Sequence, residues 1–255
     1  MIVTTYRRSW KWLLSAVCLS AFLMVSSHVP AFGQHAKKPS APKIGQSAQA
    51  HVRIGREQME KGRYALAVRS FSAAIRRDPA NAEAHLLRGT AYDRAGVPHA
   101  AIKDFTRYIE LNPNDPIGYL RRADANNFNL DHEAALEDYN KAARLSPSSV
   151  STHLGRGLAY AGLQKYDEAI KEYQWILRLN PKNVEALGNM GVACMMAGRS
   201  MEAMQYFEKA LELETDPQWR AKIEKWTEKL LQEANARKAE SPARKRPAGP
   251  VKNLW

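Results

Sequence analysis

Apolar and polar residues follow the period of a helix along most of the chain, in short blocks that end at turn residues. In one block His153, Gly157 and Tyr160 recur at spacings of three or four residues, which places them on a single helical face. Glycine-containing runs at 61–63, 95–97 and 197–199 separate other blocks. The pattern predicts an all-α protein made of short amphipathic helices joined by tight turns.

The blocks recur at a fixed offset of 34 residues. A small residue, an alanine, an aromatic residue and a proline each return at the same place in successive units. Proline cannot continue a helix, and it biases the residue before it away from helical dihedral angles, so each unit ends on schedule. The recurrence predicts five helix–turn–helix repeats over residues 48–217, namely 48–81, 82–115, 116–149, 150–183 and 184–217. The recurring residues are Gly55, Gly89, Ala123, Gly157 and Gly191; Ala67, Ala101, Ala135, Ala169 and Ala203; Phe71, Phe105, Tyr139, Tyr173 and Phe207; and Pro79, Pro113, Pro147 and Pro181.

This pattern resembles the tetratricopeptide repeat (TPR), a 34-residue helix–turn–helix unit. The clearest copy is residues 150–183, with its Tyr-Asp-Glu-Ala-Ile run at 166–170 and its Leu-Asn-Pro run at 179–181. The resemblance implies an α-solenoid, in which antiparallel helix pairs stack into a right-handed superhelix with a concave groove.

A repeat array needs a cap, because no single repeat can bury its apolar faces alone. After the fifth repeat, one apolar stripe recurs at helical spacing, and the opposite face is charged. We therefore predict a capping helix at 218–236. Its stripe consists of Trp219, Ile223, Trp226 and Leu230.

By the same resemblance, a stripe of the first helix of each repeat lines the concave groove. This stripe is polar toward its first half and apolar toward its second. The chaperone-adaptor subfamily grips a terminal carboxylate with Lys and Asn here, but the matching places hold residues such as Arg56, Thr90 and Asp124. An apolar stripe with methionines suits an amphipathic helix or an extended peptide of a partner; alternatively, it packs under the capping helix. The candidate partner-binding residues are Leu120, Asp124, Leu154, Leu158, Val192, Met195 and Met196.

The first 33 residues have the features of an export signal. A basic start precedes an uncharged run of 14 residues at 12–25, which is short for a membrane span of about 20 residues. Small residues then favour cleavage after Gly33, with Ala31 as the competing site. The chain is expected in the periplasm or outside the cell, unless an uncleaved signal anchors it in the membrane. Cleavage would leave Cys194 as a lone thiol on a buried helix face.

The net charge of +12 lies in the flanks and not in the repeats. Residues 48–234 hold 26 Lys and Arg against 25 Asp and Glu, which leaves +1. The excess lies in the signal, in a predicted flexible linker at 34–47 and in a predicted disordered basic tail at 237–255. A folded nucleic-acid binder would carry its basic patch on its own surface, so no nucleic-acid partner is expected.

The sequence contains no motif for catalysis or for a cofactor. It has no glycine-rich phosphate loop, paired-cysteine motif or nucleophile elbow, so we expect no enzyme activity, no cofactor and no metal. Three histidines recur in register with the repeat, too far apart to share one ion, and we interpret them as packing residues. Acidic residues are expected on helix surfaces, paired with nearby bases. The recurring histidines are His51, His85 and His153, whereas His99 and His132 fall in turns and are expected to be exposed.

Together these features favour a scaffold or adaptor that binds a protein or peptide partner in a helical-repeat groove. The competing interpretation is a structural or self-assembling subunit, in which the groove or the cap contacts a second copy. An enzyme accessory or a nucleic-acid binder that acts through the basic flanks is the weakest hypothesis, because those flanks lie outside the repeats.

Overall fold

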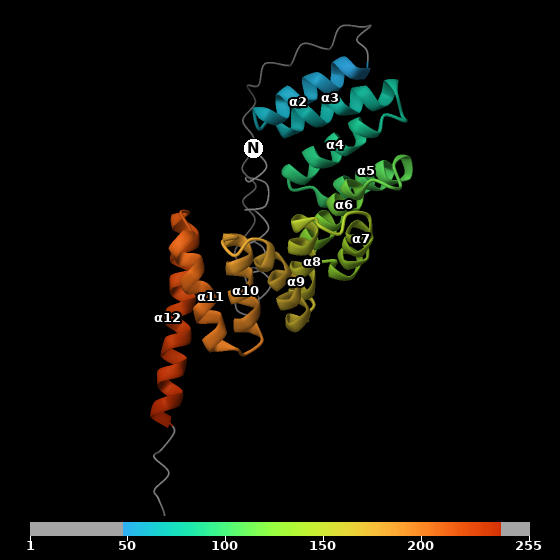
Figure 1. Ribbon diagram of the computed structural model, residues 1–255. Helices are drawn as coiled ribbons and strands as arrows, with labels where there is room; N and C mark the ends of the chain where they lie inside the picture. The colour runs from blue at the N-terminus through green and yellow to red at the C-terminus, as the bar shows by residue number, and fades with distance from the viewer. Residues whose placement is uncertain (1–47, 241–255) are drawn as a thin grey trace, which may run out of the picture. The chain divides into compact units, whose positions relative to one another are not determined.

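The computed structural model describes residues 48–240, with side chains as far as residue 236. Every regular element in this part of the chain is an α-helix (Figure 1). The predicted signal at 1–33, the linker at 34–47 and the end of the tail at 241–255 lie outside the described residues. The helices are α2 (Ala48–Glu60), α3 (Tyr64–Arg77), α4 (Ala82–Arg94), α5 (Pro98–Leu111), α6 (Pro116–Phe128), α7 (His132–Leu145), α8 (Val150–Gly162), α9 (Tyr166–Leu179), α10 (Val184–Met196), α11 (Ser200–Leu213) and α12 (Pro217–Glu240).

The helices pair in chain order, and each pair occupies one predicted repeat. Helix α2 packs on α3, α4 on α5 and α6 on α7, and each pair then packs on the next through α3 and α4, α5 and α6, and α7 and α8. The chain divides into two compact units between Glu172 and Tyr173, inside α9. In the second unit α10 packs on α11, and α11 packs on α12. The predicted all-α repeat array is confirmed.

Short polar side chains begin the first helix of four repeats. Asn81, Asp115, Ser149 and Asn183 each accept a hydrogen bond from a backbone N–H in the first turn of α4, α6, α8 and α10, which satisfies donors that have no partner within the helix. These caps follow the recurring prolines by two residues. The end of one repeat and the start of the next are therefore encoded in the same four-residue segment.

The turn between the two helices of each repeat contains one residue with a left-handed backbone. Glycine fills this place in the first, second and fifth repeats, for example Gly62 with φ of +68°. The third and fourth repeats instead have Leu130 with φ of +65° and Gln164 with φ of +59°. A side chain with a Cβ atom is disfavoured in this conformation, so these two turns are strained.

The recurring aromatic residue packs against the recurring glycine of its own repeat. A Cβ atom on Gly89 would lie 2.7 Å from Cε1 of Phe105, and one on Gly191 would lie 2.4 Å from Cδ1 of Phe207. A small residue is therefore needed at these positions for two reasons: the aromatic ring fills the adjacent space, and the two helices approach closely. Tyr139 also reaches the next repeat, where its ring lies against Gly155.

Helix α12 covers the last repeat with the predicted apolar stripe. Trp219, Ile223 and Leu230 are buried, and the ring of Trp226 stacks on Phe207 of α11 with a centroid distance of 5.6 Å. The helix runs to Glu240, four residues beyond the predicted end at 236. The start of the predicted disordered tail is therefore helical, because residues 236–240 contain strong helix formers. No described helix has the length and apolar character that a membrane span requires.

Candidate functional site

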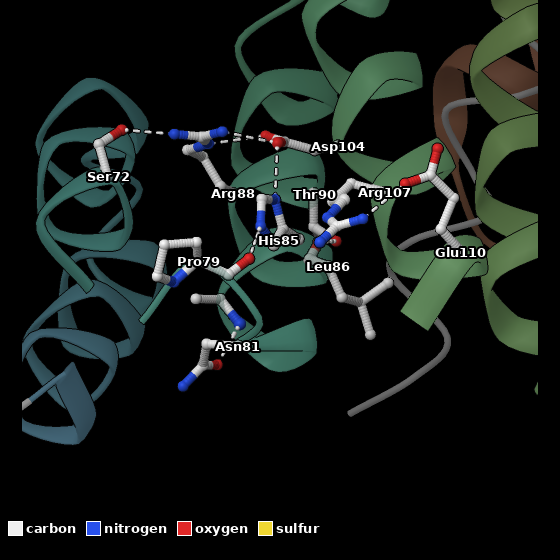
Figure 2. Close-up of polar contacts among 11 residues, drawn as sticks. Ser72, Pro79, Asn81, His85, Leu86, Arg88, Thr90, Asp104, Arg107 and Glu110 are labelled. Atoms are coloured by element: carbon white, nitrogen blue, oxygen red, sulfur yellow. Dashed lines mark hydrogen bonds and ion pairs between the residues drawn. The ribbon is translucent and has the colours of Figure 1, made fainter. Parts of the chain in front are cut away.

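A buried ion pair joins the two helices of the second repeat (Figure 2). Arg88 of α4 donates two hydrogen bonds to the carboxylate of Asp104 of α5, at 2.8 and 2.7 Å, and a third to the hydroxyl of Ser72 in the preceding repeat, at 3.1 Å. His85 lies between the Asp104 carboxylate, at 3.3 Å, and the carbonyl of Pro79, at 3.1 Å. Asp104 is only 4% exposed. The network ties α4 to both neighbouring second helices.

The same network recurs in the next two repeats. In the third, Arg122 donates to Asp138 at 2.7 and 2.8 Å and to the hydroxyl of Thr106 at 3.1 Å. In the fourth, Arg156 donates to Glu172 at 2.8 Å and to Asn140 at 3.2 Å. The expectation that the acids lie on helix surfaces is therefore wrong for the buried Asp104 and Asp138. We call these contacts the arginine ladder.

The arginine ladder accounts for two of the three recurring histidines. His153 lies 2.7 Å from the Glu172 carboxylate and 3.1 Å from the Pro147 carbonyl, as His85 does in its own repeat. His51, in the first repeat, is 1% exposed, and burial lowers its pKa with smaller contributions from Arg77 and Arg76. These side chains pack inside the repeats, as predicted.

The two turn histidines differ from each other. His99 is exposed, as expected. The expectation was wrong for His132, which is half-buried: its Nδ1 lies 2.6 Å from Oδ1 of Asn127, and its ring lies against Gly162 of α8. Burial lowers the pKa of His132. Within residues 48–236 no group of three or more potential metal-ligating side chains comes together.

The predicted partner-binding residues divide into buried and half-exposed sets. Leu120, Leu154 and Leu158 are 8%, 4% and 3% exposed, so they form the base of the first-helix stripe and present little surface to a partner. Asp124 in the first unit and Val192, Met195 and Met196 in the second are half-exposed. The exposed part of the candidate site therefore contains one acid and three apolar residues.

In the first unit the stripe is polar and crossed by ion pairs. Arg56 of α2 pairs with Glu83 of α4. Asp124 of α6 accepts a hydrogen bond from the hydroxyl of Tyr139 at 2.9 Å and lies 3.6 Å from Nη1 of Arg121. Burial raises the pKa of Asp124 to about 6, against the opposing effects of Arg121 and Tyr139. Burial disfavours the charged form of the Asp124 carboxylate. A basic group that came close to it would therefore stabilise that charged form.

In the second unit the stripe is apolar and lies on α10. Ala193 and Cys194, which face the core, are 1% and 0% exposed, whereas the flanking Val192, Met195 and Met196 keep part of their surface in solvent. Burial raises the pKa of the Cys194 thiol to about 11, so the thiol is protonated and unreactive at neutral pH. The predicted inert cysteine is consistent with this environment.

Comparisons with known proteins agree with the repeat architecture. A tetratricopeptide repeat model matches residues 52–116 and 154–218, which together make up just over half of the chain, and a second TPR repeat model matches residues 131–164. A search of curated proteins found no match.

Solved structures with the same fold include other TPR proteins. A crystal structure of MamA protein is 27% identical, with a TM-score of 0.60 over 66% of this chain and 92% of that chain. TTC0263, a thermophilic TPR protein of Thermus thermophilus, is 24% identical, with a TM-score of 0.58 over 71% of this chain and 98% of that one. YrrB, described as a TPR protein with an unusual peptide-binding site, is 16% identical, with a TM-score of 0.58 over 70% and 92%. The last two likenesses concern the fold alone. The 34-residue recurrence, the helix pairs and the matching family models together show that this chain belongs to the tetratricopeptide repeat family.

Proposed function

We propose that this chain is an exported protein-interaction scaffold that binds a segment of a partner protein on its first-helix stripe. The tetratricopeptide repeat is a protein-interaction fold, and the similar YrrB is described as having a peptide-binding site. Export takes the protein to the cell envelope or outside the cell, where it meets its partner.

The observation that carries the proposal is the half-exposed apolar stripe on α10. Val192, Met195 and Met196 retain solvent-exposed surface, although their neighbours on the same helix are fully buried. Binding is favoured when a partner covers apolar groups that remain partly in water, because their apolar surface is then removed from water. Methionine also adapts its flexible side chain to the contour of a bound helix or peptide.

The polar stripe of the first unit supports recognition of a different kind. The Arg56–Glu83 pair presents charge at the surface, with side chains 54% and 39% exposed, and exposed charges set orientation and association rate more than affinity. We assign the apolar anchoring of the partner to the second unit, on α10.

The proposal predicts a specific loss of binding when a charge is placed on the α10 stripe. Val192→Asp with Met195→Asp should weaken partner binding by about thirtyfold or more, which corresponds to the ~2 kcal/mol typical of a disrupted anchor. Met201→Asp is the matched control, because Met201 is 67% exposed and lies on α11, outside the stripe. Partners are captured from envelope extract on the chain from residue 34, purified, and titrated by calorimetry against each variant.

Thermal melts separate the possible outcomes of this experiment. If the double variant keeps its melting temperature and still binds, the site lies elsewhere and the proposal is wrong. If the double variant melts early while Met201→Asp does not, the stripe is part of the packed core and does not serve as a docking surface. Cell fractionation with N-terminal sequencing tests the location: an exported form that begins at residue 32 or 34 supports it, and a cytoplasmic protein that begins at Met1 contradicts it.

A further inference from the structure

The seam between the last two repeats departs from the arginine ladder. In the fifth repeat the arginine position holds Met190, which is fully buried, and the acid position holds Tyr206. Gln174 stands at the position that accepts a hydrogen bond from the arginine in the earlier seams. The guanidinium–carboxylate pair that fills the earlier seams is therefore replaced at this one by residues of a different chemistry.

A pocket of about 400 Å³ lies at this seam, between α9 and α11. Its volume falls within the range of about 300–1,000 Å³ that is usual for ligand sites. Its apolar lining includes Leu187, which is buried, and Leu177, which is half-buried. Arg178 and Lys209 also line the pocket, and both are exposed. The pocket is formed mainly by second helices, so it is separate from the α10 stripe and does not depend on the function proposed above.

The pocket carries positive charge that the described part of the chain does not neutralise. Neither Arg178 nor Lys209 has a carboxylate within ion-pair distance among the described residues, and no acid lines the pocket. The Nζ of Lys209 lies 5.6 Å from the centroid of the Tyr206 ring. Two cations above an apolar and aromatic surface are complementary to a carboxylate joined to an apolar side chain.

We propose that this pocket binds an acidic peptide segment of a partner protein. One aliphatic or aromatic side chain of the segment contacts the half-buried Leu177 and Tyr206, and an adjacent carboxylate pairs with Arg178 and Lys209. The chain's own flanks do not fit this role, because residues 34–47 carry a net charge of +3 and residues 235–255 a net charge of +5, and like charges disfavour docking. The scaffold then has a second interaction surface, on its second helices.

A defined peptide serves as the probe. It has a Leu-Trp pair flanked on each side by glutamates, and it is compared with a version that has lysines for the glutamates and a version that has Gly-Ser for Leu-Trp. Binding to the chain from residue 34 is followed by fluorescence anisotropy at 0.1 M and 1 M salt, where the screening length falls from about 10 to 3 Å. Amide chemical shifts of Leu177, Leu187 and Tyr206 report the location.

Three double variants test the assignment, and two of them change the net charge by the same amount. Arg178→Glu with Lys209→Glu should weaken binding of the acidic peptide at least tenfold, and Arg178→Gln with Lys209→Gln should weaken it less. Lys165→Glu with Lys225→Glu changes the net charge equally at exposed positions that do not line the pocket, and it should leave binding within about twofold. Circular dichroism melts confirm that all variants fold.

The proposal is supported if the acidic Leu-Trp peptide binds, shifts the three amides and responds to the pocket variants as stated. It is overturned if the lysine version or the Gly-Ser version binds as tightly as the acidic Leu-Trp peptide. The site would then not require both the glutamates and the apolar pair. Equal effects of the pocket and control variants overturn it as well, and so do shifts confined to α12 or to Val192, Met195 and Met196 of the α10 stripe. A dimer that dissociates in the Arg178→Glu, Lys209→Glu variant without peptide would assign the pocket to a second copy of the chain.

Discussion

Removing one carboxylate from the arginine ladder should destabilise the protein far more than removing an exposed one. In Asp104→Ala, Arg88 loses both of its bonds to the carboxylate, and His85 loses one partner. Breaking a buried ion pair costs about 3–5 kcal/mol, because a charge is left without its partner. The Arg88 side chain is 22% exposed and partly regains water, so we expect a loss near the lower end, at about 3 kcal/mol.

Two comparison variants distinguish the ladder from ordinary surface charge. Glu110→Ala removes the exposed partner of Arg107 on the same helix, where the side chains are 44% and 55% exposed, and such pairs contribute about 0.2–1 kcal/mol (Figure 2). Arg88→Leu with Asp104→Leu removes both charges together, and buried ion pairs replaced by apolar residues are often neutral in stability. The double variant should therefore be more stable than Asp104→Ala alone.

The assay is urea unfolding followed by circular dichroism. With slopes of about 1–3 kcal/mol per molar urea, a loss of 3 kcal/mol moves the midpoint by about 1 M or more. Repeat arrays can unfold in steps, so hydrogen exchange of the α4 and α5 amides provides a local measure. Equal losses for Asp104→Ala and Glu110→Ala, or a double variant no better than the single one, would refute the reasoning.

Three further predictions concern packing, backbone strain and protonation. Ala169→Leu should cost about 1–3 kcal/mol by overfilling a fully buried position, whereas Lys171→Leu should change the urea midpoint little; equal losses would contradict the repeat register. Leu130→Gly should raise the melting temperature by relieving a φ of +65° at a residue that is 58% exposed, and a lower melting temperature would contradict the strain. Because the folded pKa of Asp124 is raised to about 6 from 3.8, the folded state holds the extra proton between these values, so the unfolding free energy should fall as pH rises from about 4 to 6. Asp124→Asn should remove that component of the slope in urea melts at each pH, and an unchanged slope would argue against it.

Much of the fold could be predicted because its rules are local. Proline and the paired small and aromatic residues act within one repeat, so their recurrence at 34 residues was enough to predict the helix pairs. The strained turn at Leu130 follows from the same register, since Gly62 and Gly96 hold its place in the first two repeats.

The arginine ladder was missed because its partners are far apart on the chain. Arg88 and Asp104 are 16 residues apart and on different helices, so a search for neighbouring charges does not connect them. A signal was nevertheless present: Arg88, Arg122 and Arg156 recur at the repeat offset, and so do Asp104, Asp138 and Glu172. A charge that recurs in register with core positions predicts an internal pair.

Helix periodicity identifies the face of a helix on which the candidate residues lie, but not how deeply each one is buried. Leu158 and Val192 hold the same position in successive repeats, yet Leu158 is buried and Val192 is half-exposed. The depth of each position is set by the side chains of the neighbouring helices, which the spacing within one helix does not contain. Anchoring tests therefore belong on α10 and not on Leu158.

Photo-crosslinking in living cells tests the central claim most directly, because it captures a partner of any identity. A photoreactive amino acid is placed at Met195 on the stripe or at Met201 outside it, in the full-length chain. The account predicts a discrete crosslinked adduct with another protein from position 195, identified by mass spectrometry, and no such adduct from position 201. An adduct from position 201 alone, or from neither position while the protein is folded and abundant, would contradict the assignment of the first-helix stripe as the partner-binding surface.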